Sequence, residues 1–170
     1  MPDLRITEIF LSLQGEANTV GLPTVFVRLT GCPLRCQYCD SEYAFSGGTM
    51  MPLDDIVSQV HDLGVRHVTV TGGEPLAQPN VIELMQRLVD ASYSVSVETS
   101  GALSVERVPA LVQHLLIVGG DHVYITVDRE EGGRVDEVQC FSLARHDIFQ
   151  LEQLGDAIGG GGGGGVGGGG

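Results

Sequence analysis

The sequence predicts an α/β fold built on a parallel sheet. Strand-like and helix-like stretches alternate between residues 6 and 115, which is the order of parallel strands joined by right-handed crossovers. The 170 residues are 42% hydrophobic and 18% charged, as in an ordinary globular domain. From residue 159 the chain is almost entirely glycine, which cannot form a core. We therefore expect one folded domain over residues 1–158 and a disordered glycine tail over 159–170.

The first elements follow from residue type and periodicity. Residues 6–13 and 24–31 are rich in β-branched and aromatic side chains and predict two strands. Glycine, asparagine and proline between them predict the connecting loop. Residues 53–64 predict a helix, because apolar side chains recur at a spacing of three and four and Gly64 suits its C-cap.

The pattern then repeats. Residues 67–73 predict a short strand that runs into glycines. Residues 79–91 predict a second helix, with Pro79 at its start and an apolar face along its length. Residues 93–101 predict the next strand.

The remainder of the chain gives weaker patterns. A third helix is expected over 104–115, with Ser104 in a cap-like position. Further on we expect one or two strands within 117–128, a turn at 130–134 and a last helix within 141–157.

Charge and composition limit the partners. The formal net charge is −13, and all nine basic residues are arginine, which argues against direct binding of nucleic acid. We find neither an apolar run long enough to span a membrane nor a signal-like start, so we expect no membrane segment and a cytoplasmic location. Thiols stay reduced there, and clustered cysteines more often bind metals than form disulfides.

Three cysteines, Cys32, Cys36 and Cys39, form the pattern C-x3-C-x2-C, whereas Cys140 lies about a hundred residues away. Three thiolates on one loop suit a cubane iron–sulfur cluster with one iron left open for a small molecule. A structural zinc ion would need a fourth ligand, and His61 or His67 are candidates. The spacing favours the iron–sulfur cluster and leaves zinc as the alternative.

Two motifs together resemble the radical S-adenosylmethionine (SAM) superfamily. The first is the cysteine pattern with an aromatic residue, Tyr38, before the last cysteine, and the second is TGGEP at residues 71–75. Glycines at the carboxyl edge of a strand let the backbone approach a ligand closely. The resemblance implies a [4Fe–4S] cluster on the three cysteines and the cosubstrate SAM. The residues that it assigns to SAM are Tyr38, Cys39, Asp40 and Gly73.

Further stretches are similar to one family, the 7-carboxy-7-deazaguanine synthases. They are EIFLSLQGE (8–16), GLPTVFVRLTGCPLRCQYCDS (21–41) and ETSG (98–101). The similarity runs from residue 6 to about residue 110 and implies a partial (β/α) barrel of the radical SAM type. It also implies a lyase of queuosine biosynthesis, which converts 6-carboxy-5,6,7,8-tetrahydropterin into 7-carboxy-7-deazaguanine with loss of ammonia. The radical is borne by the cofactor, so no catalytic side chain is expected.

The resemblance also assigns residues to the substrate and to Mg²⁺. It places the pterin against the backbone of Leu13, Gln14 and Gly15 and against the side chains of Arg28 and Thr71. A buried arginine in an apolar strand needs a partner. For Arg28 that partner is a substrate carboxylate or, alternatively, an internal salt bridge. Ser41 is the implied Mg²⁺ ligand, and Glu98 and Ser100 could face the ribose of SAM.

Beyond about residue 115 the chain diverges from the family. The family has a lysine near the cosubstrate, and this chain has no lysine. We therefore expect an incomplete C-terminal half. Two other functions stay open: a glycyl-radical-activating enzyme and a catalytically inactive, cluster-binding fragment. The resemblance further implies a homodimer and an electron donor such as flavodoxin.

Overall fold

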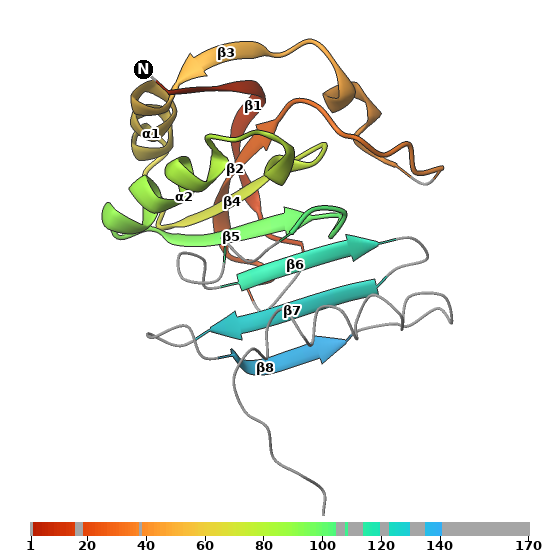
Figure 1. Ribbon diagram of the computed structural model, residues 1–170. Coiled ribbons are helices and arrows are strands. Elements are labelled where there is room, and N and C mark those ends of the chain that lie inside the picture. The colour runs from red at the N-terminus through yellow and green to blue at the C-terminus, as the bar shows by residue number, and fades with distance from the viewer. Residues whose placement is uncertain are drawn as a thin grey trace, which may run out of the picture.

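In the computed structural model the chain forms a mixed sheet covered by helices (Figure 1). The structure describes residues 2–15, 19–37, 39–104 and 108, and the backbone of 114–119, 123–129 and 135–140. The described elements are β1 (Asp3–Leu13), β2 (Pro23–Leu29), η1 (Glu42–Phe45), β3 (Thr49–Pro52), α1 (Leu53–Asp62), β4 (His67–Gly72), η2 (Pro75–Ala77), α2 (Val81–Asp90), β5 (Ser94–Thr99), β6 (His114–Gly119), β7 (Val123–Arg129) and β8 (Val135–Cys140).

The strand order across the sheet is β3-β1-β2-β4-β5-β6-β7-β8. The central strands β2, β4, β5 and β6 are parallel to one another, as predicted. Antiparallel strands flank them, because β1 pairs with β2 and β3 on one side and β7 pairs with β6 and β8 on the other. The helix α1 precedes β4 and α2 connects β4 to β5, so this part has the βαβ connectivity expected from the sequence.

The predicted strands and helices up to residue 101 are confirmed, with ends that differ by a few residues. The predicted third helix is wrong at its end, because His114 and Leu115 begin strand β6. The expected strands within 117–128 are confirmed as the end of β6 and most of β7, whereas β3 and β8 were not predicted. The turn at 130–134, the last helix and the glycine tail lie outside the described residues.

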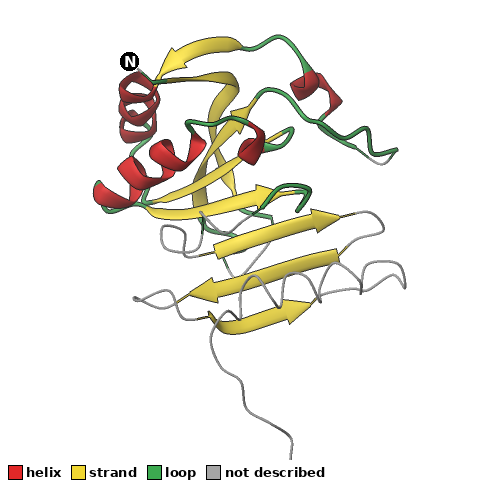
Figure 2. Cartoon of the chain, viewed as in Figure 1, coloured by secondary structure: helices red, strands yellow, loops and turns green. Residues whose placement is uncertain are grey.

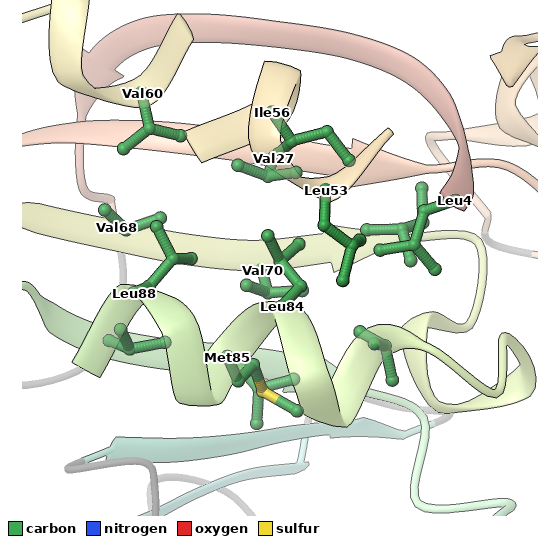
Figure 3. Close-up of a cluster of buried hydrophobic side chains, with 14 of the residues drawn as sticks. Leu4, Val27, Leu53, Ile56, Val60, Val68, Val70, Leu84, Met85 and Leu88 are labelled. Carbon is green, nitrogen blue, oxygen red and sulfur yellow. The ribbon is translucent and has the colours of Figure 1, made fainter. Parts of the chain in front are cut away.

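Both helices pack on the same face of the sheet (Figure 2). Their buried side chains meet valines and leucines of the strands in one apolar cluster (Figure 3). The fully buried members include Leu53, Ile56 and Val60 of α1 and Leu84, Met85 and Leu88 of α2. Burial of one such side chain contributes about 1.5–3 kcal/mol, so this layer fixes the strands in place. Neither described helix has the length and apolar composition needed to cross a membrane.

Alternation along the central strands gives the sheet two different faces. Valines at 25, 27, 68, 70, 95 and 97 face the helices and belong to the apolar cluster. Because successive side chains in a strand point to opposite faces, the intervening residues face the other way. They include Arg28, Thr69, Thr71, Ser96 and Glu98. We call this side the polar face of the sheet.

Candidate functional site

The cysteine loop, residues 31–41, follows the carboxyl end of β2. Its first residue is anchored by the backbone, because Gly31 N donates to Ala44 O of η1 at 2.8 Å. Arg35 Nη1 donates to Cys32 O at 2.8 Å, and its guanidinium lies 4.3 Å from the Phe45 ring centroid. The loop therefore contacts the short helix η1 through its first residue and through Arg35, and it leaves the sheet where the parallel strands end (Figure 1).

A close backbone contact joins this loop to the end of β4. Glu74 N donates to Gly31 O at 2.8 Å, and Gly73 N donates to Leu29 O at 3.2 Å. A Cβ atom at residue 73 would lie 2.3 Å from Gly31 O and 2.8 Å from Cys32 Cβ, so only glycine fits here. The glycine that the sequence assigns to SAM thus touches the loop that carries the cysteines.

The three cysteines are free thiols, and each is partly exposed. Cys39 N donates to Cys36 O at 3.2 Å, which bends the loop between them. Among the described residues no group of three histidine, cysteine, aspartate or glutamate side chains is gathered for a metal ion. The donor set, three accessible thiols on one loop, fits a [4Fe–4S] cluster in kind, and its side chains would have to turn toward a common centre to bind one.

The histidines proposed for a zinc site lie at the wrong end of the sheet. His67 is the first residue of β4, and His61 lies near the end of α1, which leads into β4. At a rise of about 3.3 Å per residue, His67 is about 20 Å from the glycines at the other end of the strand. A Cys3His zinc site completed by these histidines is therefore excluded.

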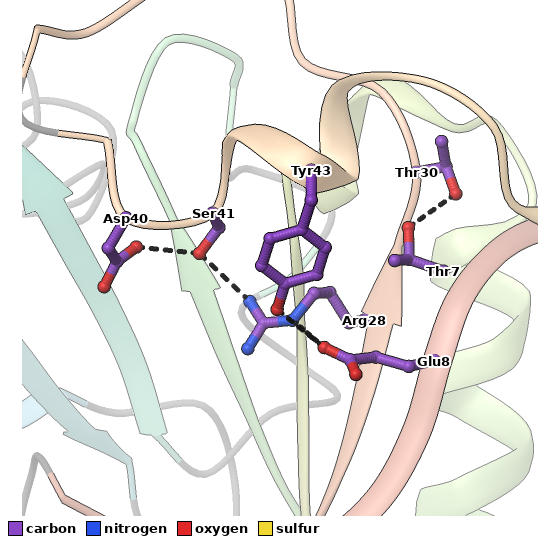
Figure 4. Close-up of polar contacts among 7 residues, drawn as sticks. All are labelled: Thr7, Glu8, Arg28, Thr30, Asp40, Ser41 and Tyr43. Atoms are coloured by element: carbon purple, nitrogen blue, oxygen red, sulfur yellow. Dashed lines mark hydrogen bonds and ion pairs between the residues drawn. The ribbon is translucent and has the colours of Figure 1, made fainter.

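Arg28 near the end of β2 has an internal partner (Figure 4). Its Nε donates to Glu8 Oε1 at 2.8 Å, and only 16% of its side chain is exposed. Tyr43 donates its hydroxyl to the same Glu8 oxygen at 2.7 Å. The internal ion pair that the sequence left as an alternative is present. The Tyr43 hydroxyl and the Arg28 guanidinium hold the pKa of Glu8 below its usual value, and the carboxylate raises the pKa of Tyr43.

The other end of the guanidinium faces Asp40 and Ser41 at the end of the cysteine loop (Figure 4). Arg28 Nη1 lies 3.4 Å from Ser41 Oγ, which donates to Asp40 Oδ1 at 2.7 Å. The predicted Mg²⁺ ligand is therefore next to the predicted carboxylate-binding arginine. Tyr38, also assigned to SAM, lies outside the described residues.

Hydrogen bonds connect the side chains of the polar face. Gln14, only 4% exposed, donates from Nε2 to Thr69 Oγ1 at 3.0 Å. Glu98 is hydrogen-bonded to Thr71 and Gln14, and burial raises the pKa of its carboxyl. Thr71 pairs in register with Arg28. One row across the sheet therefore holds Arg28, Thr71 and Glu98.

The structure does not place the whole predicted hairpin motif in this group. The main chain of Gln14 closes the hairpin, since Gln14 N donates to Leu22 O and Gln14 O accepts from Gly21 N. Only the side chain of Gln14 reaches the polar face. Leu13 is 62% exposed and pairs with Pro23 of β2. Gly15, the residue after Gln14, is also exposed.

Glu74 ties the carboxyl ends of β4 and β5 together. Its side chain is completely buried and accepts from Thr99 Oγ1 at 2.8 Å and from Ser100 N at 2.8 Å. It also accepts from Ser100 Oγ at 2.5 Å and from Leu76 N at 3.0 Å. This carboxylate fixes Gly73 relative to Ser100.

Sequence reasoning missed Glu8 and Tyr43 and placed Glu98 beside the SAM ribose. Glu8 and Arg28 are direct cross-strand neighbours, and a correct register would have paired them. The alternation V-S-V-E in β5 also puts Glu98 on the face of Ser96, which would have grouped it with Thr71.

The fold and the site define a radical SAM domain: parallel strands whose carboxyl ends meet a three-cysteine loop and a glycine turn. The model of the Radical SAM superfamily matches residues 26–129, and the chain belongs to that superfamily. Membership implies a [4Fe–4S] cluster and SAM as cofactors, and the enzymes of this class that the chain resembles act on a small molecule.

Several curated proteins similar to this chain are 7-carboxy-7-deazaguanine synthases. The chain is 49% identical to the enzyme of Koribacter versatilis over 108 residues, 62% of this chain and 48% of that protein. It is 37% identical to the Thermoplasma acidophilum enzyme over 125 residues, 74% of this chain and 56% of that protein. The resemblance seen in the sequence is confirmed, and the chain spans about half the length of these relatives.

The fold is also found among solved structures. The crystal structure of QueE from Escherichia coli superposes with a TM-score of 0.63 at 22% sequence identity. The superposition covers 93% of this chain and 77% of that chain. The partial barrel of the radical SAM type expected from the sequence is therefore the fold of this chain.

Proposed function

We propose that this chain acts as a 7-carboxy-7-deazaguanine synthase, a lyase of queuosine biosynthesis. It would convert 6-carboxy-5,6,7,8-tetrahydropterin into 7-carboxy-7-deazaguanine and release ammonia. One observation carries the proposal: Arg28 and Thr71, which the resemblance assigns to the substrate, lie together with the Gln14 side chain on the polar face, next to the end of the cysteine loop. The curated relatives support the same reaction.

The side chains of the polar face suit a carboxylated pterin. The Nη end of Arg28 offers donors for the substrate carboxylate. Thr71, Gln14 and Glu98 offer donors and acceptors for the heteroatoms of the ring. Burial raises the pKa of Glu98, so its carboxyl keeps a proton to higher pH than an exposed glutamate does. Of the hairpin motif, the proposal uses the side chain of Gln14, because Leu13 and Gly15 lie outside this group.

Cys32, Cys36 and Cys39 would hold the [4Fe–4S] cluster. When bound, the cluster and SAM together supply the one-electron chemistry that removes a hydrogen atom from C6 of the pterin. Gly73 would present its backbone to the amino group of SAM, and Tyr38, Cys39 and Asp40 would line the rest of that site. The role of the protein is to place substrate and cosubstrate side by side and to shield them.

Ser41 and Asp40 are the proposed Mg²⁺ ligands, of which the sequence named only Ser41. Their oxygens lie 2.7 Å apart, and Mg²⁺ prefers oxygen ligands and keeps several waters. The Arg28 guanidinium lies close enough to Ser41 to repel a bound Mg²⁺. A substrate carboxylate placed between the guanidinium and the Mg²⁺ would bind to both of them. A homodimer, an electron donor such as flavodoxin and a cytoplasmic location are also part of this proposal.

The test is anaerobic reconstitution with iron and sulfide, followed by assays for 5′-deoxyadenosine and for the deazaguanine product by mass spectrometry. The proposal expects both products, and only when the carboxylated tetrahydropterin is present. Formation of 5′-deoxyadenosine without the deazaguanine would point to another radical reaction, such as glycyl-radical activation. A cluster that forms without any SAM cleavage would identify a cluster-binding fragment. Addition of EDTA should lower the rate if Mg²⁺ takes part.

A further inference from the structure

Among the described residues, the short hydrogen bond to the Arg28 guanidinium is on its Nε side. Its Nε–H is taken by Glu8 Oε1 at 2.8 Å, from the adjacent strand β1. On the Nη side, Nη1 lies 3.4 Å from Ser41 Oγ, which is a weak contact. A guanidinium can bind a carboxylate through two parallel hydrogen bonds. Because Glu8 occupies Nε, a ligand carboxylate is left with the Nη1–Nη2 pair.

Two aromatic rings flank the same guanidinium. Arg28 Cζ lies 5.8 Å from the Phe10 ring centroid and 5.7 Å from that of Tyr43. Phe10 is itself stacked on Phe26 at 5.2 Å. Both rings are within the range of cation–π attraction and limit the tilt of the guanidinium. Arg28 is thus restrained by its Nε bond and by its two flanking rings.

Tyr43 adds a second restraint on Glu8. Its side chain is 57% exposed, yet its hydroxyl donates to Glu8 Oε1 at 2.7 Å. The same oxygen therefore receives Arg28 Nε and the Tyr43 hydroxyl (Figure 4). Tyr43 belongs to η1, which anchors the cysteine loop, so this contact also relates Arg28 to that loop.

We propose that Glu8 and Tyr43 are positioning residues for substrate binding: they fix Arg28 so that its Nη1–Nη2 edge, directed toward Ser41, receives the substrate carboxylate. This inference rests on the proposed function. Neither residue touches the substrate. They restrict the Arg28 side chain before the substrate binds, so less conformational entropy is lost on binding.

Competition between Glu8 and the substrate carboxylate would change binding in the opposite direction. Glu8 is a carboxylate near the place where the substrate carboxylate would bind, so it could simply compete for Arg28. If competition dominates, removal of the Glu8 charge tightens binding. If positioning dominates, loss of the Glu8 acceptor weakens binding, and a neutral acceptor in its place largely restores it. The two effects therefore differ in sign.

The experiment is an anaerobic titration of the full chain with 6-carboxytetrahydropterin and with a tetrahydropterin that lacks the carboxyl group. In Glu8→Ala we expect Kd for the carboxylated ligand to rise about tenfold, whereas Glu8→Gln stays within about threefold of wild type. Tyr43→Phe, which keeps the ring, should raise Kd about threefold. Binding of the ligand without the carboxyl group should not change in any variant. In steady-state assays the same variants should change KM and leave kcat within about twofold.

Two controls separate positioning from general damage. Glu83→Ala breaks a comparable ion pair, Arg87 Nη2 to Glu83 Oε1 at 2.6 Å, on α2 outside the site, and should leave both Kd values unchanged. In an Arg28→Ala background, Glu8→Ala should have no further effect on Kd. Equally weakened binding of both ligands, or tighter binding in Glu8→Ala and Glu8→Gln, would overturn this inference. Either result would leave the proposed function standing. A wild-type chain that does not distinguish the two ligands would overturn the proposed function, and the inference with it.

Discussion

The contact between Gly73 and the cysteine loop gives the sharpest prediction. In Gly73→Ala the new methyl group would meet Gly31 O at 2.3 Å, Gly31 C at 2.7 Å and Cys32 Cβ at 2.8 Å. The first two atoms are backbone and cannot rotate away. The strand end and the loop must therefore separate by about 1 Å to reach ordinary van der Waals contact.

The cost follows from this displacement. Overpacking of this kind costs about 1–3 kcal/mol. The separation also stretches the hydrogen bond from Glu74 N to Gly31 O, now 2.8 Å, which is worth about 1 kcal/mol. We therefore expect Gly73→Ala to lower the free energy of unfolding by about 2–4 kcal/mol. The same shift moves Cys32 away from its place beside β4 and should reduce cluster loading.

The assay combines urea denaturation with iron and sulfide analysis after anaerobic reconstitution. Leu88→Ala is the matched control, because Leu88 is fully buried in α2 and its truncation costs about 2–5 kcal/mol. The control should lose stability and keep its iron content per folded molecule, whereas Gly73→Ala should lose both. A Gly73→Ala protein with wild-type stability and a full complement of iron would refute the reasoning.

Three further predictions concern the carboxylates and the thiols. Glu74→Gln places an amide among four donor groups, so we expect a loss of about 2–4 kcal/mol in urea denaturation. Glu98 has a raised pKa, so the folded state keeps its proton to higher pH than the unfolded state, and stability falls as pH rises through that interval. Glu98→Gln should remove this fall, measured as unfolding free energy between about pH 4 and pH 8. Cys36→Ser should abolish cluster binding in iron analysis, whereas Cys140→Ser should leave it intact.

A specific result would contradict each of these three predictions. An unfolding free energy of Glu74→Gln within about 0.5 kcal/mol of wild type would mean that the buried carboxylate does not hold the strand ends. Parallel pH profiles for wild type and Glu98→Gln would show that Glu98 titrates normally. Loss of iron in Cys140→Ser would bring a fourth cysteine into the ligand set.

The sequence predicted the strands with regular alternation and missed those without it. In β4 and β5 two valines alternate with polar residues, so both strands were identifiable. The strand β3 has only four residues and ends in proline, which gives no periodic signal. Near residue 114 the run of apolar residues fits a helix as well as a strand, and the tertiary pairing of β6 with β5 decides the outcome.

In the candidate site, too, local patterns were found in the sequence and a long-range contact was missed. The cysteine spacing and the glycine turn are local, and both were found in the sequence. The partner of Arg28 was not, because the pairing of β1 with β2 contains an irregularity between Ile6 and Glu8 that local patterns do not reveal. The sequence showed that Arg28 needs a partner. Only the three-dimensional register shows that this partner is Glu8.

The two-faced central strands have a consequence for how this protein can change. The positions that hold the fold together, such as Val68, Val70 and Val97, alternate with the positions that would meet a ligand, such as Thr69 and Thr71. A substitution at a ligand position leaves the helix-covered layer untouched. Shifting a strand by one residue would exchange the two sets and damage both at once. Substrate preference can therefore evolve one residue at a time on a fixed frame, whereas insertions within these strands should be eliminated.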